Sequence, residues 1–170
     1  MVYLVRHAEK SSQPANDPLL TPEGQARARA LADVLAHAGV GAVITTQYAR
    51  TKQTAAPLAE RLGITPEVVA VAAGVASNPQ AQADAARLHV ASTVAAIRTH
   101  AGSAVLVVGH SNTIPAIVTA LGGPAFPDLC DGDYDQLFIL EIPASGPPRL
   151  VRARYGAPAV DAACAKMQSP

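Results

Sequence analysis

The chain opens with a strand that ends directly in two basic side chains. Val2 to Val5 is an apolar run rich in β-branched residues, long enough for one buried strand, and it stops abruptly at Arg6 and His7. Open α/β sheets bind their ligands at the carboxyl ends of their strands. A buried strand does not need this pair, because a long cation there must find an anionic partner or stay in water. The opening therefore predicts a functional position at a sheet edge, with a strand that simply exits into solvent as the alternative.

A second apolar run is followed by another arginine. Val40 to Thr45 leads directly into a predicted helix that carries Arg50 in its first turn and stops at Gly63. An arginine at the positive end of a helix is mildly unfavourable unless an anion lies nearby, and an exposed side chain is the alternative. We expect Arg50 to lie at the same edge of the sheet as Arg6.

The clearest buried strand comes late in the chain. Ala104 to Val108 is apolar on both faces, as in a parallel sheet, and it ends in Gly109 and His110 before a helix from Ile114 to Leu121. This repeats the opening arrangement of a strand, a basic residue and a helix start. We therefore expect four side chains to converge on one crevice: Arg6, His7, Arg50 and His110.

The first helix is predicted from its cap and its apolar periodicity. Thr21 has the character of an N-cap and is followed by Pro22 at the first helical position. The helix is expected to run to about Ala38, with Arg27 and Arg29 outside its apolar face. Shorter strands are predicted at 66–71, 136–142 and 149–155.

An alanine-rich stretch from Asn78 to His100 is most simply interpreted as one long helix. His89 and His100 are interpreted as surface or helix-end residues. Six residues are expected to pack toward the sheet: Ala85, Leu88, Ala91, Val94, Ala95 and Ile97.

Length and composition limit the class of protein. The chain has 170 residues, which favours one domain over 1–155 with a loosely held tail at 156–170. Its formal net charge is zero, so no basic surplus favours binding to nucleic acid or to an anionic membrane. No apolar run could span a bilayer and the start is unlike a signal peptide, which predicts a cytoplasmic protein, or an exported one if a leader was removed.

Neither the cysteines nor the acidic loop predicts a metal site. Cys130 and Cys164 are interpreted as two ordinary thiols, with a disulfide between them as the alternative. The segment from Asp131 to Asp135 resembles a calcium loop at first, but Gln136 and Ile142 stand where such a loop needs glycine and glutamate.

Two guanidinium groups and two imidazoles in one crevice suit a compact dianion such as a phosphoryl group. Phosphoryl transfer needs an in-line nucleophile and positive charge on the equatorial oxygens, and a neutral imidazole can attack phosphorus to form a phosphohistidine. A metal held by the two histidines is the alternative, but both arginines would repel a cation and no carboxylate cluster accompanies them.

Three ordered motifs resemble those of the histidine phosphatase superfamily, also called the phosphoglycerate mutase-like family. They are Arg6-His7-Ala8-Glu9 after the first strand, the threonine-rich segment 46–55 around Arg50, and Gly109-His110-Ser111-Asn112 after the late buried strand. The similarity extends over nearly the whole chain. It implies a three-layer α/β/α sandwich around a largely parallel sheet, with no metal and no organic cofactor.

The resemblance also implies residue roles. His7 would accept the phosphoryl group, while Arg6, Arg50 and His110 would hold its oxygens. Further candidates for substrate contact are Asn16, Ser111 and Asn112.

The chain departs from the family in the proton donor. Many members carry an acidic residue after the third strand or directly after the second histidine, whereas here Ser111 follows His110 and no acid occurs from Val68 to Ala83. The candidates that could replace this acid as proton donor are Glu9, Asp84 and the acidic loop 131–135.

The leading hypothesis is a metal-independent phosphatase that acts through phospho-His7 on a phosphorylated small molecule or a phosphohistidine protein. The short chain resembles the compact phosphohistidine phosphatase subgroup, and a phosphoramidate leaving group depends less on a dedicated acid. A phosphoglycerate-type mutase is the enzymatic alternative, although little in the chain could close over the site. A non-catalytic phosphate-binding module is the alternative of another class.

Overall fold

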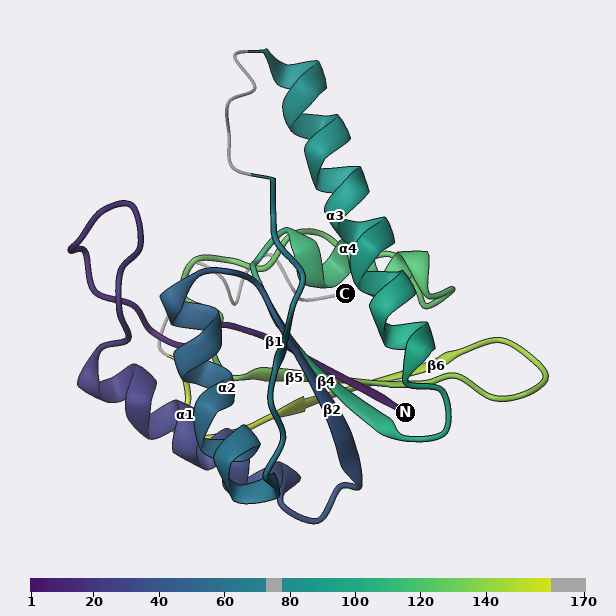
Figure 1. The fold of residues 1–170 in the computed structure, drawn as a ribbon, viewed down its shortest axis with the longest axis horizontal. Coiled ribbons are helices and arrows are strands. Elements are labelled where there is room, and N and C mark those ends of the chain that lie inside the picture. Colours follow the sequence, from purple (N-terminus) through teal and green to yellow (C-terminus); the bar gives the residue numbers. More distant parts are fainter. Residues whose placement is uncertain (73–77, 160–170) are drawn as a thin grey trace.

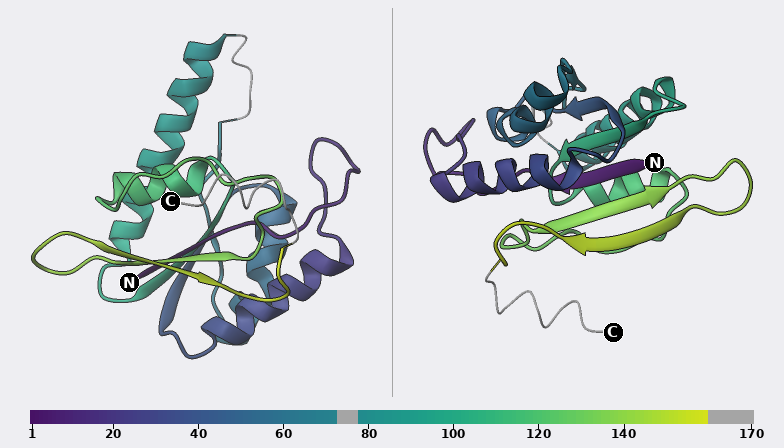
Figure 2. Two further views of the ribbon diagram at one scale, coloured as in Figure 1. Left: turned by 180° about the vertical axis from the view of Figure 1, so that it is seen from behind. Right: turned by 90° about the horizontal axis from the view of Figure 1, so that it is seen from below.

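The protein is built around one mixed β-sheet, seen here in a computed structural model that describes residues 1–72 and 78–159 (Figure 1). Over these residues the strand order is β3-β2-β4-β1-β5-β6. Strands β3, β2, β4 and β1 are mutually parallel, whereas β5 and β6 form an antiparallel hairpin at one edge (Figure 2). The predicted largely parallel sheet is confirmed. The strands are β1 (Val2–Arg6), β2 (Val40–Thr45), β3 (Glu67–Val68), β4 (Ala104–Gly109), β5 (Gln136–Glu141) and β6 (Arg149–Arg154).

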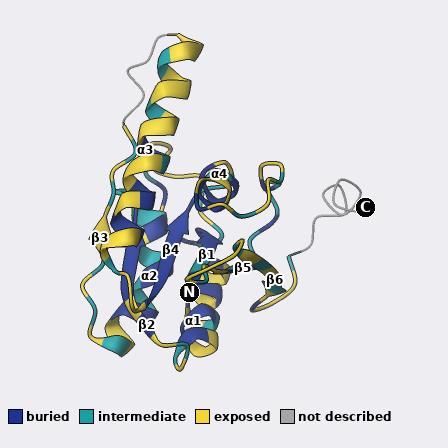
Figure 3. Cartoon of the chain, turned by 90° about the vertical axis from the view of Figure 1, so that its right-hand side faces the viewer, coloured by how far each residue is buried: buried dark blue, intermediate teal, exposed yellow. Residues whose placement is uncertain are grey.

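Helices cover both faces of the sheet. On one face, α1 (Pro22–Leu35) and α2 (Ala49–Leu62) bury a core with β2 and β4. On the other face, α3 (Pro79–Thr99) and α4 (Thr113–Ala120) bury a second core around Phe138 of β5. In Figure 3 the central strands β1, β2 and β4 and the inner faces of the helices are the buried parts. The chain therefore has the predicted three-layer α/β/α architecture.

The helix ends follow the local chemistry expected of them. The Thr21 hydroxyl accepts a hydrogen bond from the Gly24 amide at 3.2 Å, which confirms the predicted N-cap of α1. The helix ends at Leu35, slightly earlier than expected, and the chain turns at Gly39 with a φ of 70°. Gly63 caps α2 in the left-handed conformation that favours glycine.

Arg27 was expected on the outside of α1, and this expectation is wrong. Its side chain is buried and 5% of the residue is exposed. Both carboxylate oxygens of Glu9 accept hydrogen bonds from its guanidinium, and NH1 donates to the carbonyl oxygens of Tyr155 and Ala157. These partners are distant in sequence, so no periodicity within α1 could indicate that they satisfy a buried cation.

The long helix α3 packs on the sheet over only part of its length. Its amino-terminal half extends beyond the sheet, where most of its surface is exposed (Figures 1 and 3). Val94 and Ile97 are buried as predicted. Leu88, Ala91 and Ala95 were expected to pack inward but are exposed, because the inward face of α3 is carried by another set of residues. These are His89, Thr93, Val94, Ala96 and Ile97.

The first residues of the predicted C-terminal tail are held in place. Arg27 binds the carbonyl of Ala157, and the amide of Ala159 donates to the carboxylate of Asp135 at 3.1 Å. The expectation of a loose tail is therefore wrong for residues 156–159. Residues 160–170 lie outside the described residues, as does the alternative in which Cys164 pairs with Cys130.

No described helix combines the length and the apolar character needed to cross a membrane.

Candidate active site

The pairing of β1 with β4 brings two histidines together at the carboxyl edge of the sheet. Arg6 is in register with Gly109, and the amide of His7 donates to the Gly109 carbonyl at 2.9 Å. His110 directly follows Gly109 in the chain. Its ring lies edge-on to the ring of His7, with 5.5 Å between the two ring centroids. The expected juxtaposition of His7 and His110 therefore follows from strand register.

Gly109 makes the sharp turn after β4 possible. A Cβ atom at this position would lie 2.8 Å from the Thr113 hydroxyl and 2.9 Å from Cδ1 of Ile114. The Thr113 hydroxyl accepts a hydrogen bond from the His110 amide at 2.9 Å. This contact between the turn and the start of α4 holds His110 beside the sheet edge.

The His7 ring is oriented as a nucleophile should be. Its Nδ1 lies 2.8 Å from the Ala8 carbonyl oxygen, and since a carbonyl only accepts, Nδ1 carries the proton. The lone pair is therefore on Nε2. Burial lowers the pKa of His7 from 6.5 to about 4; the hydrogen bond to Ala8 opposes this shift, and the charges of Arg6 and Arg50 add to it.

The His110 ring is fixed by a chain of hydroxyl groups. Its Nε2 lies 3.1 Å from the hydroxyl of Thr46, which in turn contacts the hydroxyl of Thr51 at 2.9 Å. Burial, followed by the charge of Arg50, lowers the pKa of His110 to about 3. Both imidazoles are therefore neutral near pH 7 in the ligand-free protein.

Arg6 is held from the acidic loop. Its NH1 donates to the carbonyl oxygens of Cys130 at 2.6 Å and Asp131 at 2.9 Å, and its guanidinium lies 4.4 Å from the ring centroid of Tyr134. The residue is 5% exposed, and its Nε is buried without a hydrogen-bond partner among the described residues. A buried donor left unpaired is costly, so this position favours an acceptor supplied by a ligand.

Arg50 lies in the first turn of α2, as expected. Its guanidinium is 4.2 Å from the ring centroid of Tyr48 and 4.0 Å from the carboxylate of Asp17, which also accepts from the Ala49 amide. Its Nε is likewise buried and unpaired among the described residues. Two arginines thus present unsatisfied donors to one region.

These groups line a pocket of about 480 Å³, which we call the carboxyl-edge pocket. All four side chains that were expected to converge line it, and so do Ser111 and Asn112. Asn16 is exposed and is not among the residues that line it. The full set of lining residues includes Arg6, His7, Lys10, Tyr48, Arg50, Gln82, His89, His110, Ser111, Asn112 and Asp131.

The structure adds His89 to the pocket and corrects its interpretation as a surface residue. His89 is 4% exposed, and its Nδ1 lies 3.3 Å from the carbonyl oxygen of Ala70. It follows Gln82, Ala85 and Ala86 on the face of α3 that lines the pocket. The helical spacing of these residues could be recognised in the sequence. The sequence did not show that α3 extends beyond the sheet and brings this face to the pocket.

The acidic substitutes for a proton donor are mostly engaged elsewhere. Glu9 binds Arg27, and Asp84 is paired with Arg87 on the exposed part of α3. Asp131 lines the pocket, with a fully exposed carboxylate 3.6 Å from Arg6. Among the described residues, no cluster of three or more histidine, cysteine or acidic side chains is arranged to hold a metal ion.

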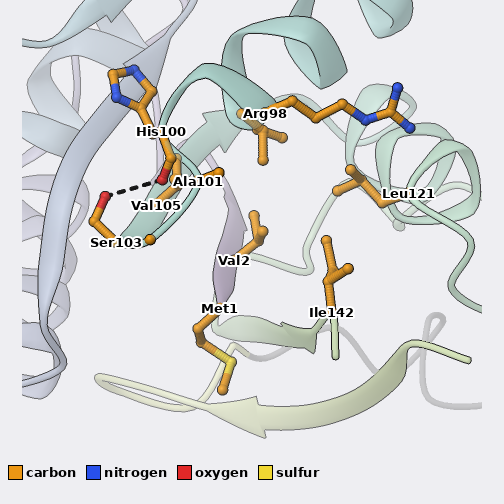
Figure 4. A pocket seen from close by; sticks show the side chains of 11 residues that line it. Met1, Val2, Arg98, His100, Ala101, Ser103, Val105, Leu121 and Ile142 are labelled. Atoms are coloured by element: carbon orange, nitrogen blue, oxygen red, sulfur yellow. Dashed lines mark hydrogen bonds between the residues drawn. The ribbon is translucent and has the colours of Figure 1, made fainter. Parts of the chain in front are cut away.

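A second cavity lies at the opposite end of β1 and β4. This amino-edge cavity has a volume of about 410 Å³ and is lined by Val2, Val105, Leu121 and Ile142 among others (Figure 4). His100 borders it, but its Nε2 lies 3.1 Å from the Glu67 carboxylate. Its lining is mainly apolar and has no cluster of cations.

Comparison with known proteins identifies a family over the first part of the chain. The family model described as the histidine phosphatase superfamily (branch 1) matches residues 2–72, which include Arg6, His7 and Arg50. None of the curated proteins matches the chain significantly.

Solved structures of phosphatases share the fold. The protein histidine phosphatase SixA complexed with tungstate has a TM-score of 0.65 and 20% identity, covering 90% of this chain and 96% of that one. A putative phosphohistidine phosphatase from Agrobacterium tumefaciens has a TM-score of 0.58 and 21% identity, covering 92% and 97%. A mycobacterial glucosyl-3-phosphoglycerate phosphatase has a TM-score of 0.62 and 18% identity, covering 92% and 98%.

At these identities the solved structures establish the fold alone, while the family match concerns the sequence. The chain therefore resembles the histidine phosphatase superfamily in sequence over residues 2–72, and it shares its fold with solved phosphatases over most of its length.

Proposed function

We propose that the chain is a metal-independent phosphatase that hydrolyses a phosphomonoester or a phosphohistidine through a phosphohistidine intermediate on His7. The match of residues 2–72 to the histidine phosphatase family model supports phosphatase activity in general. The observation that carries the mechanism is that His7, whose Nε2 has the lone pair, lines the same pocket as Arg6 and Arg50. We further propose that residues 1–155 act as a single catalytic domain.

The first chemical step is attack on phosphorus. Nε2 of His7 forms a bond to the phosphorus atom while the bond to the leaving group breaks on the opposite side. The hydrogen bond from Nδ1 to Ala8 fixes the ring orientation and stabilises the positive charge that the ring gains. A water molecule then attacks the phosphohistidine, which releases phosphate and restores His7.

The cations hold the equatorial oxygens of the phosphoryl group. Arg6 and Arg50 each have a buried Nε without a protein acceptor, so a phosphoryl oxygen would satisfy both positions without breaking existing hydrogen bonds. The arrangement is rigid, because Arg6 is tied to the loop at Cys130 and Arg50 is stacked on Tyr48. Preorganised charge of this kind stabilises the transition state more than it stabilises a substrate in water.

His110 completes the oxygen-binding set from β4. Its Nε2 contacts the Thr46 hydroxyl, which can donate to this nitrogen or accept from it. The ring lies close enough to His7 to share one phosphoryl group with it. Burial lowers the pKa of His110 to about 3, so the ring is neutral in the ligand-free protein. The ring would gain its positive charge only when the anionic phosphoryl group binds beside it.

Two findings support a compact phosphohistidine-type or activated substrate within this class. SixA, which shares the fold, is a protein histidine phosphatase that binds the oxyanion tungstate. Among the described residues, Asp131 is the only carboxylate that lines the carboxyl-edge pocket, and its side chain is exposed. A phosphoramidate leaves more readily than an alkoxide and needs less help from an acid.

The proposal is tested by trapping the intermediate. The protein is mixed with p-nitrophenyl phosphate in the presence of EDTA, quenched in alkali and digested for peptide mass spectrometry. We expect an alkali-stable, acid-labile phosphoryl group on His7 and turnover that EDTA does not affect. Turnover that EDTA abolishes, or a phosphoryl group on another residue, would overturn the proposed mechanism. Phosphohistidine protein, sugar phosphates and phosphoglycerate are then compared by kcat/KM to define the substrate class.

A further inference from the structure

A third imidazole lines the carboxyl-edge pocket without a place in the mechanism described so far. His89 is carried by α3, which extends past the carboxyl ends of β1 and β4 and forms a wall of the pocket beyond them (Figure 1). It is 4% exposed and packs beside the segment that follows β3. A polar ring buried at this position needs either a second protein partner or a ligand.

The one hydrogen bond of the His89 ring defines its tautomer. Nδ1 lies 3.3 Å from the Ala70 carbonyl oxygen, and because that oxygen only accepts, Nδ1 carries the proton. Nε2 therefore has the lone pair, and the hydrogen bond that holds the ring is made by Nδ1. The ring is thus held through Nδ1, and Nε2 is its basic nitrogen.

His89 is also close enough to the phosphoryl-binding groups to interact with them. Its charged form disfavours the charged form of His110, and both rings line the same pocket. In-line transfer places the leaving atom on the side of phosphorus opposite Nε2 of His7, which is the side facing away from the strand ends. The amino-terminal half of α3 contributes Gln82, Ala85, Ala86 and His89 to the lining of this same pocket.

The carboxylates of the chain are less suited to this position. Glu9 is occupied by Arg27 on the far side of the His7 loop, and Asp84 by Arg87. Asp131 enters the pocket from the loop that binds Arg6, and its carboxylate is in water. The stretch from Val68 to Ala83 carries no acid.

We propose that His89 is the proton-transfer residue for the leaving group, an inference that rests on the proposed phosphatase function. A substrate monoanion brings one proton, which passes to Nε2 of His89. As the bond between phosphorus and oxygen breaks and His7 bonds to phosphorus, Nε2 gives this proton to the departing oxygen. In the second step, water loses a proton to Nε2 as its oxygen bonds to phosphorus and the bond to His7 breaks. That proton then leaves with phosphate or passes to solvent, and His89 returns to its starting form.

The test uses the dependence of rate on the leaving group. We compare wild type with His89→Gln on phenyl phosphate and p-nitrophenyl phosphate. Because a poor leaving group needs its proton and a good one does not, we expect kcat/KM to fall about 100-fold for phenyl phosphate and less than about 5-fold for p-nitrophenyl phosphate. His100→Gln is the matched control, since His100 lies at the other end of α3 and away from the pocket.

Each outcome separates this inference from the function on which it rests. Equal losses on both substrates would mean that His89 only supports the structure, which overturns the inference and leaves the phosphatase assignment intact. If His89→Gln does not fold, the wild type decides: a shallow dependence of kcat/KM on the pKa of the leaving phenol supports proton donation, and a steep one overturns it. Wild type that turns over neither ester, nor a phosphohistidine substrate, would instead overturn the proposed function.

Discussion

The two ends of β1 and β4 carry cavities of similar size and opposite chemistry. The carboxyl-edge pocket of about 480 Å³ has two arginines and three histidines in its lining, whereas the amino-edge cavity of about 410 Å³ is mainly apolar (Figure 4). The same strands run through both. Volume therefore does not distinguish a reaction site from a gap in packing, and the buried unpaired donors of Arg6 and Arg50 do.

The difference follows from what begins at each end of the strands. At the carboxyl ends the chain turns into the first turns of α2 and α4, whose amide groups and partial positive charge favour an anion. At the amino ends the strands are entered from turns such as the one at Gly102, which has a φ of 104°. Substitutions at the carboxyl-edge pocket, each paired with a control at the amino-edge cavity, test this comparison by kinetics and unfolding measurements.

The largest expected effect is the loss of the nucleophile. His7→Ala should lower kcat for p-nitrophenyl phosphate by at least about 1,000-fold, because it removes the group that forms the covalent intermediate. His100→Ala, at the amino-edge cavity, should leave kcat unchanged. Equal losses in the two variants, measured by steady-state kinetics on folded protein, would contradict the assignment of the reaction to the carboxyl edge.

The next effect concerns the arginines. Arg50→Ala should lower kcat/KM by about 100- to 1,000-fold, the loss that follows removal of one preorganised donor to the transition state. Arg50→Lys should recover only part of this loss, because lysine keeps the charge but not the planar pair of donors. Arg98→Ala at the amino-edge cavity is the control and should change kcat/KM little. Full activity of Arg50→Ala would exclude Arg50 from oxygen binding.

The pH dependence should reveal the buried nucleophile. Because the pKa of His7 is lowered from 6.5 to about 4, kcat/KM for a substrate whose ionisation is constant should fall about tenfold per pH unit only below about pH 4. Between pH 6.5 and about 4 the unfolded chain binds more protons at this residue than the folded one. The free energy of unfolding should therefore decrease as the pH is lowered through that interval. An acid limb near pH 6.5 would contradict the burial of His7.

The smallest effect on activity is expected at the amino-edge cavity. Leu121 is 8% exposed and packs against the core beside α4. Leu121→Ala should lower the free energy of unfolding by about 2 kcal/mol, the lower end of the range for such truncations because the site already borders a cavity. Chemical denaturation measures this change, and kcat/KM at a temperature where the variant is folded should stay within twofold of wild type. A loss of activity in folded protein would show that this cavity is coupled to the reaction site.

Local sequence patterns predicted most of the strand and helix ends, although the strand expected at 66–71 is only the two-residue β3, Glu67–Val68. Thr21 and Gly63 act through contacts within a few residues, so their chemistry can be recognised without the rest of the chain. Arg6, His7 and His110 stand where apolar runs stop, and parallel strands align such positions at one edge.

Arg27 and His89 show where such patterns fail. Each is a polar residue on a helix, where amphipathic periodicity assigns it to solvent. Arg27 is buried because Glu9 and the carbonyl of Tyr155 satisfy it, and the buried His89 has one of its two ring nitrogens bound to the carbonyl of Ala70. These partners lie 18, 128 and 19 residues away in the sequence.

The sequence by itself determined the alternation of strands and helices, the resemblance to a phosphatase family, and the four cationic or imidazole side chains at the carboxyl edge. It could do so because periodicity, capping and strand ends are local properties of a chain. Only the tertiary structure decided that Asn16 stays outside the pocket, that Glu9 is engaged by Arg27, and that His89 enters the pocket. Those outcomes depend on which distant groups meet, and hence on the packing of α1 and α3 against the sheet.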